Sequence, residues 1–200
     1  VLVKKKGAHS KQQFEINRLM QKYAKKNLSV IRLKGGDPVV FGRGGEEMQY
    51  LKKHSIPFEV VPGISAALSV PLFAGIPATH RDLSRSLAVI TGTTKDKSKA
   101  EPEIPKVDTL IVLMGITNLM SLAKKISAAE GYSDTTPAAL VYKGSLSDQK
   151  VVIGNLADIA DKQKEAGIVP PAILVVGYVA TLAVELNFKQ LLPLSHHRVV

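Results

Sequence analysis

The hydrophobic and polar positions in the first part of the chain alternate between helical and extended patterns. Apolar residues recur every three or four positions over about residues 11–26, which predicts a helix there. Three more segments continue this alternation as a strand, a helix and a strand: SVIRLK at 29–34, GEEMQYLKKH at 45–54 and PFEVVPG at 57–63. Strands that alternate with helices predict a parallel sheet with right-handed crossovers.

A third helix is expected to begin near Ser65, whose hydroxyl can cap it, and to bend or end at Pro71. The segment AGIPATHRDLS at 74–84 then interrupts the alternation and is the candidate domain boundary. We therefore expect three parts: an N-terminal α/β domain over residues 1–81, incomplete at its start, a C-terminal α/β domain over 82–188 and a tail over 189–200.

The second half of the chain repeats the alternation with longer apolar runs. A helix is predicted at 118–131, with Asn118 as its cap and Gly131 as its stop, and another over about 155–166. Five strands are predicted: SLAVITG at 86–92, DTLIVLMG at 108–115, AALVYKG at 138–144, QKVVIGNL at 149–156 and AILVVGYV at 172–179. Because few residues separate the third strand from the fourth, the two can form a hairpin, and we expect a mixed sheet.

Composition and charge exclude several classes of function. The absence of cysteine rules out disulfides, thiolate metal sites and cysteine nucleophiles. The net charge of +10 reflects either solvated lysines or an anionic partner. Nucleic acid is disfavoured, because aromatic residues make up only 5% of the chain and are not interleaved with basic ones. A small polycarboxylate substrate remains open.

Neither a signal peptide nor a membrane anchor is visible in the sequence. The most apolar run, residues 172–184, is shorter than the roughly 18 residues that a spanning helix needs. We therefore expect a cytoplasmic protein that does not bind a membrane.

Glycines mark four predicted strand ends, and ligands of open α/β sheets bind at the carboxyl ends of strands. In RLKGGDPVVFGRGGEE, at 32–47, the glycines allow close approach of a ligand to the backbone, and Asp37 offers a fixed acceptor. A tight turn is the alternative explanation of GGDP. The other three ends are VPGISAA at 61–67, LMG at 113–115 and VYKG at 141–144. No standard phosphate loop, nucleophile elbow or metal-ligand cluster accompanies them.

The runs RLKGGDPVVFGRGGEE, VPGISAALSVPLFAGIPATHRDLSRSLAVITG and TLIVLMG occur in this order and closely resemble the tetrapyrrole methylases. The resemblance covers about residues 3–187. It implies two α/β domains with the active site in the cleft between them, a homodimer, and S-adenosylmethionine as methyl donor without a metal. Within the family it is greatest to the members that methylate two ring carbons of uroporphyrinogen III, giving precorrin-2 for sirohaem and cobalamin-type cofactors.

The resemblance also implies roles for single residues. It places Lys4 as proton donor, with Lys5 as a near rival, although a lysine in a Lys-Lys-Lys run is more often simply solvated. For Met114 the alternative is core packing. The residues that it places against the donor are Gly35, Gly36, Asp37, Val40, Ser65, Ala66, Met114 and Gly144. The candidates for binding substrate carboxylates are Arg32, Arg43, His80 and Arg81, and an octacarboxylate substrate would give the positive charge a use.

The sequence departs from the family pattern at its start. The family normally begins with a strand, a glycine-proline-glycine-aspartate loop and an aspartate proposed as proton acceptor, and none of these precedes Val1. We therefore expect weak or absent catalysis by this chain alone and a marginal fold. Two alternatives stay open. One is the same fold acting on a corrin intermediate, a diphthamide precursor or ribosomal RNA; the other is an inactive basic module that binds anions or RNA.

Overall fold

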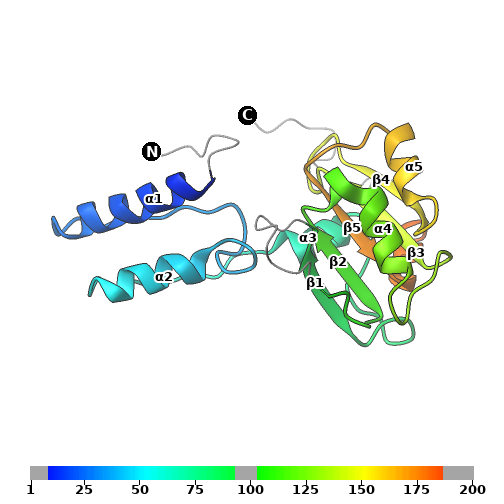
Figure 1. Ribbon diagram of the computed structural model, residues 1–200, viewed down its shortest axis with the longest axis horizontal. Coiled ribbons are helices and arrows are strands. Elements are labelled where there is room, and N and C mark those ends of the chain that lie inside the picture. Colours follow the sequence, from blue (N-terminus) through cyan, green and yellow to red (C-terminus); the bar gives the residue numbers. More distant parts are fainter. Residues whose placement is uncertain (1–8, 93–102, 187–200) are drawn as a thin grey trace. The chain divides into compact units, whose positions relative to one another are not determined.

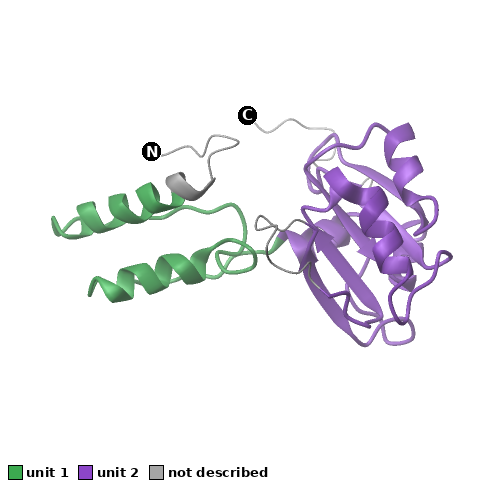
Figure 2. Ribbon diagram, viewed as in Figure 1, with its two compact units in different colours: residues 1–65 green, residues 66–200 purple. Residues whose placement is uncertain are grey.

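The computed structural model of the chain describes residues 9–92 and 103–186. It divides into two compact units, residues 1–65 and residues 66–200 (Figure 2). Each unit is described by itself below. The domain boundary expected after residue 81 stays a prediction. None of the helices in the described residues combines the length and the apolar composition that a membrane crossing requires.

The described residues of unit 1 form two helices, α1 (His9–Ala24) and α2 (Gly44–Lys53), which confirm the helices expected at 11–26 and 45–54 (Figure 1). The two helices pack against each other. Met20 is buried on α1, and the hydroxyl of Tyr50 on α2 donates to Oε1 of Gln21 at 2.8 Å. The helix pair is therefore held by specific hydrogen bonds in addition to burial.

The prediction of two strands in unit 1 is wrong. Residues 28–34 and 56–62 form no strand, and Ile31 and Leu33 are 90% and 84% exposed. Their β-branched residues favour an extended backbone, but a strand also needs a neighbour for its N–H and C=O groups. Neither segment has such a neighbour among the described residues, so the described part of unit 1 does not form the expected parallel sheet.

Unit 2 contains a mixed sheet, which confirms the expectation for the second half of the chain. Within the described residues the sheet has five strands in the order β1-β2-β5-β3-β4. The strands are β1 (Leu87–Thr91), β2 (Thr109–Leu113), β3 (Pro137–Tyr142), β4 (Lys150–Asn155) and β5 (Ala172–Val176). The first two are parallel, β5 is antiparallel to both of its neighbours, and β3 and β4 form the expected hairpin.

Helices cover both faces of this sheet (Figure 1). On one face lie α4 (Leu119–Ser127) and α5 (Ile159–Glu165); on the other lie α3 (Ala66–Phe73) and the 3-10 helix η2 (Tyr178–Ala183). Along β2 the side chains alternate, so that Leu110 and Val112 pack toward α4 and Ile111 packs toward α3. Burial on both faces explains why these strands read as continuous apolar runs.

The helix ends in unit 2 differ from those expected. Pro71 lies inside α3, which ends two residues later, in agreement with the expected bend or end. Asn118 is both the last residue of the short 3-10 helix η1 (Ile116–Asn118) and the N-cap residue of α4. Its side chain makes no capping hydrogen bond. The chain leaves α4 after Ser127, earlier than expected, and Gly131 with φ +90° completes the turn that follows.

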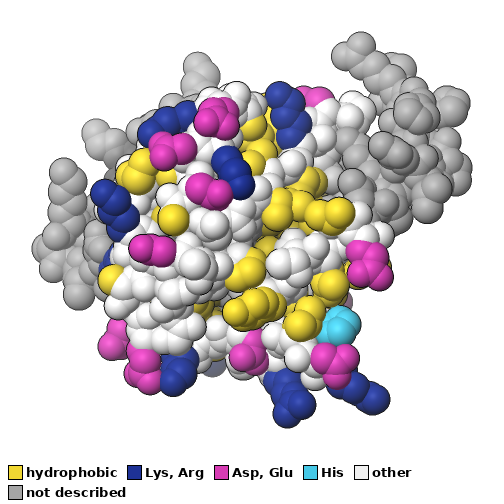
Figure 3. Space-filling view, turned by 90° about the vertical axis from the view of Figure 1, so that its right-hand side faces the viewer, with side chains coloured by type: hydrophobic (Ala, Val, Ile, Leu, Met, Phe, Trp, Pro, Cys, Tyr) yellow, Lys and Arg dark blue, Asp and Glu magenta, His cyan; other side chains and the backbone are white. Residues whose placement is uncertain are grey.

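Charge is mixed on the face shown in Figure 3. Among its described residues, Lys and Arg side chains alternate with Asp and Glu around apolar side chains near the middle of the face. This face therefore does not gather the chain's net charge of +10 into one basic patch.

Candidate functional site

The segment from Gly35 to Arg43 forms a loop that one carboxylate organises. Oδ1 of Asp37 accepts the backbone N–H groups of Val39 at 2.9 Å and Val40 at 3.0 Å, and Oδ2 accepts the N–H of Gly63 at 3.4 Å. The N–H groups of Val39 and Val40 lower the pKa of Asp37 below its ordinary value of 3.8. An ionised Asp37 therefore shapes a tight turn and joins it to residue 63.

Close backbone approaches around this loop account for several of its glycines. A Cβ on Gly63 would lie 2.5 Å from the carbonyl oxygen of Gly36, and one on Gly42 would lie 2.5 Å from that of Pro38. Gly36 itself has φ +112°, which L-residues rarely adopt. Gly35 differs, because nothing lies within 4 Å of where its Cβ would stand. The main chain at Gly35 therefore borders open space in which a ligand can lie.

Arg43 ends the loop and directly precedes α2, in the left-handed region with φ 62°. Its Nε lies 3.0 Å from Oε1 of Glu46, and its Nη2 lies 2.5 Å from Oε2. The hydrogen bonds that Arg43 donates to the Glu46 carboxylate raise the pKa of Arg43. The Arg43 side chain remains 33% exposed, so Glu46 sets the direction of the guanidinium and leaves part of it accessible.

Glu47, which sequence reasoning missed as a site residue, is the most buried carboxylate near the loop, at 5% exposed. It accepts hydrogen bonds from Nε2 of Gln13 at 2.8 Å, Nζ of Lys34 at 2.9 Å and Nε of Arg32 at 3.3 Å. Burial raises the pKa of Glu47, but the hydrogen bonds from Lys34 and Gln13 and the charge of Arg32 outweigh it and lower that pKa. The only sequence signal was the second glutamate of GGEE.

Arg32 is therefore engaged inside unit 1. Besides Glu47, its Nη1 donates to the carbonyl oxygen of Leu33 at 2.8 Å. The guanidinium that sequence analysis offered for substrate carboxylates thus has a structural use in unit 1.

In unit 2, Met114 and Gly144 follow β2 and β3. Both strands run antiparallel to β5, so their carboxyl ends lie at the same edge of the sheet. Met114 has φ 57° and is 52% exposed, so core packing does not explain it. A Cβ on Gly144 would lie 2.5 Å from Cγ1 of Val70 on α3. Val70 lies one helical turn after Ala66, which is exposed. Gly144 therefore has a packing reason to be glycine in addition to its predicted donor contact.

His80 and Arg81 lie in a tight turn of unit 2. The N–H of His80 donates to the carbonyl of Ser84 at 2.9 Å, and the N–H of Ser84 donates back at 2.8 Å. Nδ1 of His80 accepts the N–H of Asp82 at 3.2 Å, which assigns the ring proton to Nε2. Arg81 is exposed between these contacts. The turn fixes both residues in the predicted substrate-binding run.

The predicted donor residues fall on both units. Unit 1 holds Gly35, Gly36, Asp37 and Val40, which share one loop, and its last residue, Ser65. Unit 2 holds Ala66, Met114 and Gly144. Lys4 lies outside the described residues, and its role stays a prediction. Among the described residues no group of three or more acidic or histidine side chains could hold a metal ion.

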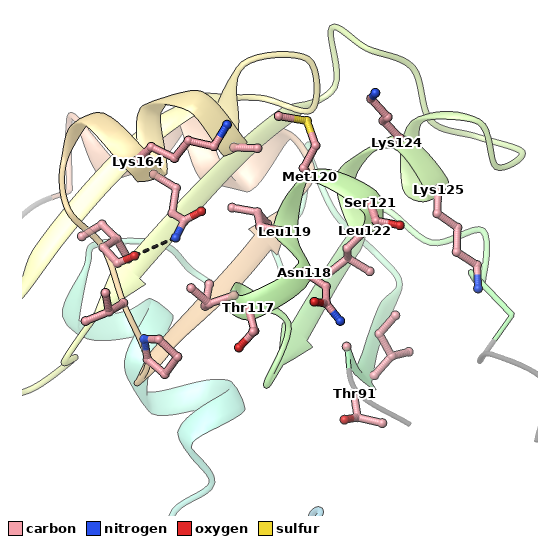
Figure 4. Close-up of a pocket in the computed structure, with 18 of the residues that line it drawn as sticks. Thr91, Thr117, Asn118, Leu119, Met120, Ser121, Leu122, Lys124, Lys125 and Lys164 are labelled. Carbon is pink, nitrogen blue, oxygen red and sulfur yellow. Dashed lines mark hydrogen bonds between the residues drawn. The ribbon is translucent and has the colours of Figure 1, made fainter. Parts of the chain in front are cut away.

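A hollow of about 740 Å³ lies in unit 2 between the end of β1, α4, α5 and residues 168–170 (Figure 4). Its floor is apolar, with Ile116 and Leu119, and Lys124, Lys125 and Lys164 line it with their charged side chains. It includes none of the residues predicted to bind donor or substrate.

Comparisons with known proteins place these features in a family. The pattern of the Tetrapyrrole (Corrin/Porphyrin) Methylases matches residues 2–160. A uroporphyrinogen-III C-methyltransferase from Methanocaldococcus jannaschii is 47% identical over 182 residues, which are 90% of this chain and 75% of the relative. A siroheme synthase from Pseudoalteromonas atlantica is 44% identical over 192 residues, 92% of this chain but only 40% of that enzyme. The chain thus spans about two-fifths of that longer relative.

Solved structures agree with the sequence relatives. A uroporphyrin-III C-methyltransferase from Thermus thermophilus superimposes with a TM-score of 0.78 at 40% identity, covering 87% of this chain and 75% of that one. The Thermus thermophilus enzyme complexed with S-adenosyl homocysteine gives a TM-score of 0.73 at 35% identity, covering 86% of this chain and 76% of that one.

Proposed function

Because the chain belongs to the tetrapyrrole (corrin/porphyrin) methylase family, we propose that it methylates two ring carbons of uroporphyrinogen III with S-adenosylmethionine, forming precorrin-2. The observation that carries this proposal is the match over nine-tenths of the chain to a uroporphyrinogen-III C-methyltransferase. The S-adenosyl homocysteine complex of a structural relative supports the choice of donor.

The residues of the loop fit such a donor. The open space beside Gly35 admits a flat nucleoside to the main chain, and the left-handed Gly36 turns the backbone around it. Asp37 is ionised and held by backbone N–H groups, so it presents a fixed negative charge to the hydroxyl or ammonium groups of a donor. In unit 2, the exposed Met114 offers an apolar, polarizable contact surface.

Methyl transfer from a sulfonium is an in-line displacement, so the protein's main task is to hold donor and ring carbon in line. The pyrrole carbon attacks the methyl carbon, the methyl–sulfur bond breaks, and the sulfur leaves as neutral S-adenosylhomocysteine. The positive charge passes to the macrocycle, which loses a proton to become neutral. Arg43, His80 and Arg81 bind the carboxylates of the substrate in this proposal. Lys4 is the proposed proton donor to the macrocycle.

Mass spectrometry tests the proposal directly. The full chain is incubated without oxygen with uroporphyrinogen III and S-adenosylmethionine, with the Thermus thermophilus enzyme in parallel as a control for the reagents. A product that carries two added methyl groups supports the proposal. Methylation of only a corrin intermediate, a diphthamide precursor or ribosomal RNA would instead assign the other substrate. The weak turnover expected from the sequence is measured in the same assay.

Two further parts of the proposal concern the setting of the enzyme. The resemblance to the family supports a homodimer, and we expect a cytoplasmic location from the sequence. Sedimentation velocity of the purified chain tests the first, with a dimer mass as the expected result. Cell fractionation with an antibody to the chain tests the second.

A further inference from the structure

Glu47 joins three separate parts of unit 1 through one buried carboxylate. It lies on the first turn of α2 and accepts a hydrogen bond from Nε2 of Gln13 on α1. It also accepts hydrogen bonds from Nζ of Lys34 and Nε of Arg32, which lie in the segment before the loop. The Lys34 side chain is itself only 13% exposed. These contacts lie 13 to 34 residues apart in sequence, so they hold tertiary rather than local structure.

The position of Lys34 gives this cluster its importance. Lys34 immediately precedes Gly35, the first residue of the loop, and Glu47 lies three residues beyond Gly44, the first residue of α2. The N–H of Gly44 also donates to the carbonyl of Pro38 at 2.9 Å. The segment that carries Gly35, Gly36, Asp37 and Val40 is thus tied across its base by Glu47.

Stability alone is a poor reason for such a cluster. Removing a carboxylate and two cations from water costs about as much as their attraction returns, and apolar replacements of similar volume are often as stable. What the ions supply is one defined geometry, because Glu47 has separate oxygens for separate partners: Oε2 for Lys34, and Oε1 for Gln13 and Arg32. That geometry places the residue that leads into the loop.

We infer that Glu47 is a positioning residue of the donor site: it holds Lys34 so that the loop from Gly35 to Arg43 keeps the conformation that binds the adenosyl donor. This inference rests on the proposed function. Glu47 does not contact the donor in this account and acts through the ion pair.

The test uses the full chain with Glu47→Gln, Lys34→Met and the double variant. The control is Glu15→Gln, which makes the same chemical change at an exposed position of α1. Binding of S-adenosylhomocysteine is measured by calorimetry well below the unfolding midpoint of every variant, and methyl transfer is measured at varied donor concentration. These readouts separate loop positioning from loss of folded protein.

We expect Glu47→Gln and Lys34→Met each to weaken S-adenosylhomocysteine binding about tenfold or more, the factor for one charge-assisted hydrogen bond. The double variant should be no weaker than the singles, because both changes break the same contact. The KM for the donor should rise more than kcat falls, and Glu15→Gln should match the wild type.

Equal donor affinity of Glu47→Gln and wild type would overturn the inference, as would additive losses in the double variant. A wild-type chain that does not bind S-adenosylhomocysteine would instead contradict the proposed function itself. The two failures are therefore distinguishable.

Discussion

Replacing Gly63 by alanine tests whether the loop at Gly35 depends on a close backbone approach. The added Cβ would lie 2.5 Å from the carbonyl oxygen of Gly36, 2.8 Å from its carbonyl carbon and 3.1 Å from the nitrogen of Asp37. All three atoms belong to the backbone, so no side chain can rotate away. Overpacking of this kind costs about 1–3 kcal/mol. Alanine recovers about 0.4–1 kcal/mol by restricting the unfolded chain, which leaves a net loss of about 0–2.6 kcal/mol, about 1.3 kcal/mol at the middle of both ranges.

The assay is urea unfolding of Gly63→Ala followed by far-ultraviolet circular dichroism, beside calorimetric binding of S-adenosylhomocysteine. Gly45→Ala is the matched control, because nothing lies within 4 Å of its added Cβ and alanine favours the interior of α2. We expect Gly63→Ala to lose both stability and donor affinity, and Gly45→Ala to be as stable as the wild type or more so. A Gly63→Ala variant with wild-type stability and affinity would refute the described contact between the two loops.

Three further predictions test other parts of the site. Gly144→Ala should lower the free energy of unfolding by about 1–3 kcal/mol, and adding Val70→Ala should restore part of it by removing the clash, as urea unfolding can check. Because the folded-state pKa of Asp37 is lowered, its contribution to stability is present above pH 3.8 and is lost as the pH falls through the lowered pKa. Asp37→Asn should therefore weaken the loss of unfolding free energy in acid, as urea unfolding at a series of pH values can measure. An unchanged dependence on pH would contradict this prediction. Arg81→Gln should raise the KM for uroporphyrinogen III about tenfold while donor affinity stays constant, since Arg81 is proposed to bind only substrate.

The sheet of unit 2 could be predicted from the sequence because its signals are local and strong. The apolar runs around β2 and β5 mark strands that are buried on both faces, and the short connection between β3 and β4 marks a hairpin. The helix ends were less accurate. The cap at Asn118, for example, lacks the hydrogen bond that its residue type predicted.

The strands of unit 1 could not be predicted in the same way. Residues 28–34 have the composition of a strand, but pairing depends on a neighbour that composition does not reveal. Local propensity therefore incorrectly indicated a strand at Ile31 and Leu33.

The candidate site was predictable only in part. The glycine pairs indicated a turn at Gly35 and Gly36, and the structure gives Gly36 a left-handed backbone. The hydrogen bond from the Gly63 N–H to Asp37, and the burial of Glu47 between Gln13 and Lys34, depend on tertiary contacts that residue spacing does not reveal. For the same reason, the sequence could not show that Arg32 is engaged by Glu47.

The central claim is that the main chain at Gly35 binds the adenosyl donor, and Gly35→Ala tests it most directly. The added methyl group meets no atom within 4 Å in the protein, and alanine restricts the unfolded chain, so the unfolding midpoint should stay at the wild-type value or rise above it. In a calorimetric titration with S-adenosylhomocysteine, we expect binding by the wild-type chain and at least about tenfold weaker binding by Gly35→Ala, because the methyl group occupies the space of the donor. Equal binding by the two proteins, or no binding by the wild type, would contradict the account.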